Sequence, residues 1–156
     1  MPRVKHEIPS FVYDPSLVLF LPLWKRDGTT FISDDAFGHT LTVTGATWGT
    51  QGRTFNGVDD NIVTSSSFNL PSITCLFWHK PSSNVAGDYT KRILEILITN
   101  FTGFDFRDGT QGVYELNYGN GTAWASLLSG ANSRVANQWG MVGATLSPTA
   151  QQIYIN

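Results

Sequence analysis

Short apolar runs separated by turn-forming residues follow one another along almost the whole chain, and no other feature limits its fold as strongly. The runs are rich in β-branched and aromatic residues, which favour strands. Gly, Asn, Asp, Pro and Ser cluster between them and favour turns. The sequence therefore predicts strands at LVLFLPL (17–23), HTLTVTG (39–45), GRTFNG (52–57), NIVTS (61–65), ITCLFWHK (73–80), RILEILITN (92–100), GFDFR (103–107), GVYELNYG (112–119), TAWASLL (122–128), WGMVGATL (139–146) and QQIYIN (151–156). This pattern, without a convincing amphipathic helix, is typical of an all-β sandwich or barrel.

Composition and charge narrow the class of protein further. The 156 residues suit one domain with a sizeable core. Hydrophobic residues make up 41% of the chain and charged residues only 14%, which excludes a disordered chain. The formal net charge of -2 leaves no excess of basic surface, so we expect no nucleic-acid partner.

The beginning of the chain predicts an arm followed by one domain. MPRVKHEIPS (1–10) lacks the apolar core of a signal peptide, and LVLFLPLW (17–24) is too short to span a bilayer. Three prolines, Pro2, Pro9 and Pro15, favour an extended arm over 1–16. We therefore expect a domain over 17–156 without membrane contact.

Two of the predicted strands are apolar on both faces. In 73–80, Ile73, Cys75 and Phe77 share one face, while Leu76 and Trp78 share the other. The run at 92–99 is likewise apolar on both faces apart from its glutamate. A two-sheet sandwich covers only one face of each strand, so we expect loops, the arm or a second subunit to cover the rest.

Four segments in order carry a resemblance to a known superfamily: LVLFLPLW (17–24), HTLTVTGATWGTQGRTFNGVDDNI (39–62), LPSITCLFWHKPSS (70–83) and QWGMVGATLSPTAQQIYIN (138–156). The chain resembles laminin-G-like members of the concanavalin A-like lectin and glucanase superfamily, of an environmental or viral type. The resemblance covers about 16–156. It implies an antiparallel two-sheet jelly-roll sandwich, and its members include binding modules.

The chain departs from the superfamily pattern at its end. Members continue with further strands after the Tyr-containing strand, whereas this sequence stops there, at Asn156. Either the sequence is a fragment, or the sheet is completed in another way. In the second case we expect an open edge that a neighbouring subunit fills, with its residues 1–16 as the candidate segment.

The acidic pair in FNGVDDNI (55–62) allows two interpretations. In the first, Asn56-Gly57 forms a turn and an aspartate accepts backbone N–H groups to fix the corner. In the second, Asp59 and Asp60 contribute to a Ca²⁺ site, which needs six to eight oxygens from several loops. We favour the turn, and expect no cofactor.

Carboxylate spacing argues against catalysis. Glucanases of the superfamily carry their carboxylates on one strand as Glu-x-Asp-x-Glu, because a period of two places them on one face. Two residues after Glu95 stands Leu97, and two after Glu115 stands Asn117. We therefore expect no enzyme and no catalytic residue, and keep glycoside hydrolysis as a distant alternative.

Aromatic side chains near loops are the candidates for ligand binding, because such rings stack on sugars. Trp24 and Trp48 adjoin predicted loops. Tyr118 and Trp124 flank the Asn120-Gly121 dipeptide, which predicts a hairpin turn. Trp78 and Trp139 lie in predicted strands, and we expect them in the core.

These observations predict a non-catalytic structural or recognition module. One version is a homo-oligomeric subunit of an extracellular or virion-type assembly, with glycan binding at rim loops. The other is a stand-alone lectin-like module that binds carbohydrate or protein. The sequence names no particular ligand, since loop geometry determines specificity in such folds.

Overall fold

The structure is a computed structural model that describes residues 10–66, 68, 70, 72–82, 92–98, 102–109, 112–119 and 122–156. The first element along the chain is a 3-10 turn, η1 (Ser10–Tyr13). The strands are β1 (Thr30–Ile32), β2 (Thr40–Thr44), β3 (Thr47–Gly49), β4 (Gly52–Thr54), β5 (Asn61–Thr64), β6 (Ile73–His79), β7 (Arg92–Ile98), β8 (Thr102–Asp108), β9 (Tyr114–Gly119), β10 (Trp124–Leu128), β11 (Gly140–Leu146) and β12 (Gln151–Ile155). All pairs are antiparallel, so the all-β prediction is confirmed.

The chain forms two compact units, residues 1–67 and 68–156. We call them the N-terminal and C-terminal units. None of the described helical residues form a segment long and apolar enough to cross a membrane. The predicted division into an arm (1–16) and a domain (17–156) stays a prediction, and residues 1–9 lie outside the described part.

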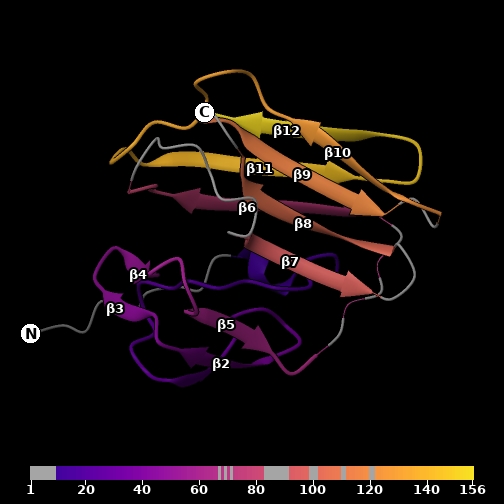
Figure 1. Cartoon of the computed structure of the whole chain (residues 1–156). Coiled ribbons are helices and arrows are strands. Elements are labelled where there is room, and N and C mark those ends of the chain that lie inside the picture. Colours follow the sequence, from indigo (N-terminus) through magenta and orange to yellow (C-terminus); the bar gives the residue numbers. More distant parts are fainter. Residues whose placement is uncertain are drawn as a thin grey trace, which may run out of the picture. The chain divides into compact units, whose positions relative to one another are not determined.

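The C-terminal unit contains two sheets that share one core (Figure 1). The strand orders are β10-β9-β8-β7 and β12-β11-β6. Phe106 and Leu116 of the four-stranded sheet and Val142 of the three-stranded sheet are fully buried. Phe77 of β6 meets Phe106 edge-on, with ring centroids 5.3 Å apart. This contact joins the sheets, because aromatic edges favour the faces of other rings.

The N-terminal unit has a smaller core under a three-stranded sheet, β1-β2-β5, beside the β3-β4 hairpin. In β2 the apolar Leu41 and Val43 point inward, while the threonines between them are exposed. Phe31 and Ala46 complete the buried cluster. This alternation is what a sheet with one covered face requires.

The predicted strand at 17–23 is wrong. Hydrogen bonds to side chains and single backbone hydrogen bonds hold this apolar segment, rather than a sheet ladder. The Phe20 N–H donates to Asp35 Oδ2 (2.9 Å), and His39 Nε2 lies 2.8 Å from the Val18 carbonyl oxygen. Pro22 has no N–H to donate to a ladder. The segment still packs apolar side chains, Leu21 and Leu23, against the N-terminal core.

A polar cluster lies where β6, β8 and β9 meet the loop before β11. His79 Nδ1 lies 3.1 Å from the Tyr114 hydroxyl oxygen, and Arg134 Nη1 lies 3.6 Å from Asp108 Oδ2. Burial lowers the pKa of His79, which Asp108 opposes and Arg134 reinforces. Burial likewise raises the pKa of Tyr114 to about 12. Both rings are therefore neutral at pH 7.

We predict that acid destabilises the C-terminal unit through His79. The unfolded side chain titrates near 6.5 and the folded one at a lower pH, so the unfolded state binds more protons between these values. Stability present above pH 6.5 should fall as the pH drops, by at most about 1.4 kcal/mol per pH unit. Urea unfolding at pH 7.5 and 5.5 measures this loss, which should be smaller in His79→Gln. Equal losses in both proteins would contradict the prediction.

Candidate functional site

Trp24 and Trp48 form an exposed aromatic pair in the N-terminal unit. Their side chains leave 48% and 42% of their surface exposed. The Trp48 indole Nε1–H donates to the backbone carbonyl oxygen of Trp24 at 3.2 Å. Through this bond the structure brings together Trp24 and Trp48, two of the four aromatic residues that the sequence singled out. We call this pair the tryptophan platform.

Arg53 fixes the loop that carries Trp24. It lies opposite Trp48 in the β3-β4 hairpin. Its guanidinium donates to the carbonyl oxygens of Ala46 (3.2 Å), Arg26 (2.5 Å) and Gly28 (2.6 Å). The same group lies 6.0 Å from the centroid of the buried Phe31 ring. One cation thus ties three carbonyl groups to the core, which limits the movement of the platform.

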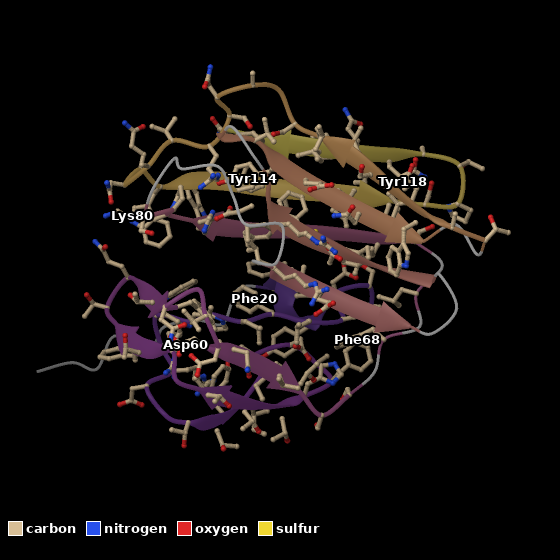
Figure 2. All side chains as sticks on the ribbon, viewed as in Figure 1. Phe20, Asp60, Phe68, Lys80, Tyr114 and Tyr118 are labelled. Atoms are coloured by element: carbon tan, nitrogen blue, oxygen red, sulfur yellow. The ribbon has the colours of Figure 1, made fainter. Side chains whose placement is uncertain are left out.

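The other two predicted aromatics point to opposite sides of their sheet. Tyr118 is half-buried and packs against the core of the C-terminal unit (Figure 2). Trp124 pairs with Gly119 at the start of β10 and is exposed. The β9-β10 hairpin is confirmed, while its Asn120-Gly121 dipeptide lies outside the described residues. These two side chains therefore do not form one surface.

The outer face of the four-stranded sheet carries two rows of mostly polar side chains, which we call the polar rows. Cross-strand register aligns the first row, Glu95, Asp105, Asn117 and Ser126. The second row consists of Arg92, Arg107, Glu115 and Leu128. The sequence showed polar residues at alternate positions, but a search for carboxylates within single strands missed their alignment across strands.

Asp105 is the most buried charge of the polar rows. Its carboxylate receives Arg107 Nε and Nη2, the second at 2.5 Å, and Asn117 Nδ2 at 3.3 Å. Arg92 Nε lies 3.8 Å from Asp105 Oδ2 and 3.1 Å from Glu95 Oε1. The hydrogen bonds from Arg107 raise the pKa of its guanidinium, against the effect of burial. Asp105 is therefore an anchor for two arginines, and its oxygens are occupied.

The outer face of the three-stranded sheet is apolar. Leu76 and Trp78 are 62% and 64% exposed, and register places Met141 beside Trp78 and Gly143 beside Leu76. Tyr154 of β12 follows across Gly143. We call this surface the apolar face. The prediction that Trp78 lies in the core is wrong, because the strand alternation turns Phe77 inward and Trp78 outward.

Trp139 also lies outside the core, contrary to the prediction. It immediately precedes β11 and is 44% exposed. The first core residue of that strand is Val142. The predicted strand began at Trp139, one residue before the observed one. The sequence pattern does not show at which residue of the strand burial begins.

The acidic corner at 56–60 is held by its own hydrogen bonds. The Asn56 N–H donates to Asp60 Oδ2 and Asn56 Nδ2–H donates to Asp59 Oδ1, both at 2.8 Å. Gly57 has the positive φ, 71°, expected of the turn (Figure 2 labels Asp60). Across the described residues, no group of three or more His, Cys, Asp or Glu side chains has the arrangement of a metal site. These bonds match the turn interpretation.

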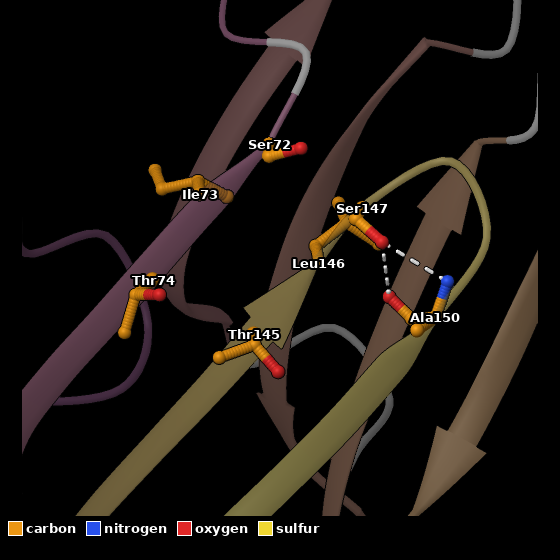
Figure 3. A pocket seen from close by; sticks show the side chains of 7 residues that line it. All are labelled: Ser72, Ile73, Thr74, Thr145, Leu146, Ser147 and Ala150. Carbon is orange, nitrogen blue, oxygen red and sulfur yellow. Dashed lines mark hydrogen bonds between the residues drawn. The ribbon is translucent and has the colours of Figure 1, made fainter.

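A shallow hollow of about 260 Å³ lies at the ends of β6 and β11 (Figure 3). Its lining residues are short or apolar: Ser72, Ile73, Thr74, Thr145, Leu146, Ser147 and Ala150. Ser147 Oγ already bonds both the N–H (3.0 Å) and the carbonyl oxygen (3.1 Å) of Ala150. The hollow contains no charged side chain, so it offers a ligand little orientation.

Comparisons with known proteins concern the fold alone. No family model matches the chain, and no curated protein matches it. The chain is similar to a solved structure, a tryptophan-to-alanine mutant of HCR/D, with a TM-score of 0.62 and 16% identity. The match covers 80% of this chain and 33% of the other, so this chain spans about a third of its length. The likeness agrees with the all-β architecture.

We predict that the acidic corner stabilises the fold without a metal. Asp60→Ala removes the acceptor of the Asn56 N–H and should lower the free energy of unfolding by about 1 kcal/mol. Excess EDTA should leave the melting temperature of the unaltered protein unchanged. A melting temperature that falls with EDTA in the unaltered protein, but not in Asp60→Ala, would instead indicate a bound cation.

Proposed function

We propose that the chain is a non-catalytic, jelly-roll recognition module that binds glycan on the tryptophan platform. The observation that carries this proposal is the exposed, fixed Trp24–Trp48 pair. Aromatic rings with few rotatable bonds supply contact area at low cost in conformational entropy. Apolar ring faces of sugars stack on such surfaces, while neighbouring polar groups bond the hydroxyls.

Polar groups for that purpose border the platform. Asp34 pairs with Arg26 and lies 4.0 Å from Lys25 Nζ. Lys25 and Arg26 directly follow Trp24, and both keep part of their side chains exposed. The charged groups supply donors and acceptors beside two aromatic rings. This combination suits a polyhydroxylated ligand better than a purely apolar one.

The non-catalytic part of the proposal rests on the polar rows. Glu95 and Asp105 stand opposite each other on neighbouring strands and are the pair of carboxylates to consider for hydrolysis of a sugar. Asp105, however, is engaged by Arg107 and Asn117, and Glu95 by Arg92. Oxygens engaged in this way are not free to contact a sugar. We therefore assign the rows to binding and stability rather than to chemistry.

The proposed setting is extracellular or virion-associated, where glycans are displayed. The superfamily resemblance supports this setting, since its members include such modules. The proposal requires no cofactor, because the stacking surface is made of side chains alone.

We predict that Trp48→Ala and Trp24→Ala each weaken glycan binding at least about tenfold, because truncating an anchoring aromatic commonly costs more than about 1.4 kcal/mol. Affinity electrophoresis against xylan, mannan, β-glucan and chitosan identifies a polysaccharide that binds the unaltered protein. Isothermal titration then measures the variants. Trp139→Ala, with a nearly equal exposed fraction in the other unit, is the matched control.

Two results would contradict the proposal. One is a polysaccharide that binds the platform variants as well as the unaltered protein. The other is the absence of binding to the whole panel. A loss in Trp124→Ala alone would move the site to the four-stranded sheet.

A second candidate function is that of a subunit in a homo-oligomeric assembly. The observation that favours it is the apolar face with its exposed Leu76 and Trp78. Exposed apolar patches of this kind mark interaction surfaces on soluble proteins. The side chains of β6 on this face are uncharged, and Lys80 directly after the strand is the first charged residue. A second copy would therefore bring few like charges together.

We predict that light scattering of the unaltered protein detects an oligomer, and that the double variant Leu76→Lys/Trp78→Lys is a monomer. In a symmetric contact the introduced lysines of the two copies would repel each other. Their ammonium groups also stay in water rather than entering a buried interface. Trp139→Lys is the control and should leave the mass unchanged. A monomeric unaltered protein at high concentration would remove this function.

A further inference from the structure

Glu115 has a buried carboxylate oxygen without a hydrogen-bond partner on the outer face of the four-stranded sheet. The residue is 7% exposed, and its Oε2 is buried without a hydrogen-bond partner. Its neighbour across the ladder is Arg107, whose Nε and Nη2 are directed to Asp105. A buried charged acceptor without a donor is unfavourable, so any group that supplies an N–H there gains that interaction in full.

The charge balance of the polar rows also favours a positively charged ligand. Three carboxylates, Glu95, Asp105 and Glu115, share this face with two guanidinium groups, Arg92 and Arg107. The arginines lie within ion-pair distance of Asp105 and Glu95. The face therefore carries one more negative charge than positive charges, and Glu115, whose charge also acts on Arg107, has an oxygen without a donor. A ligand for this position therefore carries both an N–H group and a positive charge.

The side chains around Glu115 fit a basic amino-acid side chain. Leu128 stands directly opposite Glu115 on β10 and is 58% exposed. Trp124 lies on the same face of β10, four residues earlier, and is exposed as well. Lys and Arg place their aliphatic stems on apolar surface and extend a charged head beyond it.

We propose that the outer face of the four-stranded sheet binds a lysine or arginine side chain of a partner polypeptide, with Glu115 as the acceptor and Leu128 as the support for the stem. The Glu115 oxygen is covered, so a neighbouring side chain rotates when the basic group enters. Leu128 is the neighbour in the ladder that can move, because it is 58% exposed, whereas Arg107 is held by Asp105. This site lies in the C-terminal unit and is independent of the tryptophan platform.

The test uses the full chain and acetylated pentalysine amide as the probe, in isothermal titration at 150 mM salt. Glu115→Gln keeps the shape of the side chain and removes its charge, and should weaken pentalysine binding at least about tenfold. Asp27→Asn is the matched control. It removes one exposed negative charge from the other unit and should change the affinity less than about threefold, since salt screens exposed charges.

A second variant keeps the test decisive if Glu115→Gln folds poorly. Leu128→Lys places a lysine on the strand opposite Glu115, where it should occupy the site, raise the melting temperature and abolish pentalysine binding. Leu128→Gln, which removes part of the stem's support but adds no charge, should weaken pentalysine binding only in part. The proposal is overturned if pentalysine does not bind the unaltered protein, if Glu115→Gln and Asp27→Asn weaken binding equally, or if Leu128→Lys binds pentalysine normally.

Discussion

The two-residue period of the strands is the constraint on which the C-terminal unit depends. In β8 and β9 it turns Phe106 and Leu116 into the core, and therefore turns Arg107 and Glu115 outward. In β6 it buries Phe77 against Phe106 and exposes Trp78. Each sheet of this unit thus has one face that packs in the core and one face that points away from it. The two outer faces differ in chemistry, since one carries mostly charged side chains and the other carries the exposed Leu76 and Trp78.

Cross-strand register decides what the outward residues do. Asp105 is held by Arg107 from its own strand and by Asn117 from the next strand, at a position where three strands align. A shift of one residue in β9 would turn the polar side chains into the core and the apolar ones out. The burial of Phe106 and Leu116 therefore fixes the register, and the register in turn fixes which carboxylate is satisfied. The arrangement of charges on the outer face is thus a consequence of packing on the other side of the same strands.

The sequence predicted the strands from β6 to β12 because each combines β-forming residues with turn residues at both ends. The prediction of a strand at 17–23 failed, because an apolar composition does not by itself produce a sheet ladder. Pro22 lacks an N–H, and hydrogen bonds with the side chains of Asp35 and His39 hold the segment outside any sheet. The sequence identified Trp24 and Trp48 as neighbours of loops, but their contact depends on Arg53, which lies far along the chain from the carbonyl groups that it binds. The sequence could not predict the polar rows, for a related reason. Spacing along a strand is visible in a sequence, whereas alignment between strands depends on the lengths of the connections and on core packing.

Arginine geometry explains why the two units support different proposals. Arg53 donates to three neutral carbonyl groups, so its charge stays uncompensated by a carboxylate while its hydrogen bonds hold the platform loop in place. Arg107 directs its Nε and Nη2 to one carboxylate instead, and this pair of bonds fixes the plane of its guanidinium. The same side chain therefore rigidifies an aromatic surface in one unit and leaves an acceptor unsatisfied in the other. Because these effects follow from which acceptors each arginine reaches, replacing either arginine by lysine would keep the charge and lose the property, since an ammonium group lacks the planar arrangement of donors.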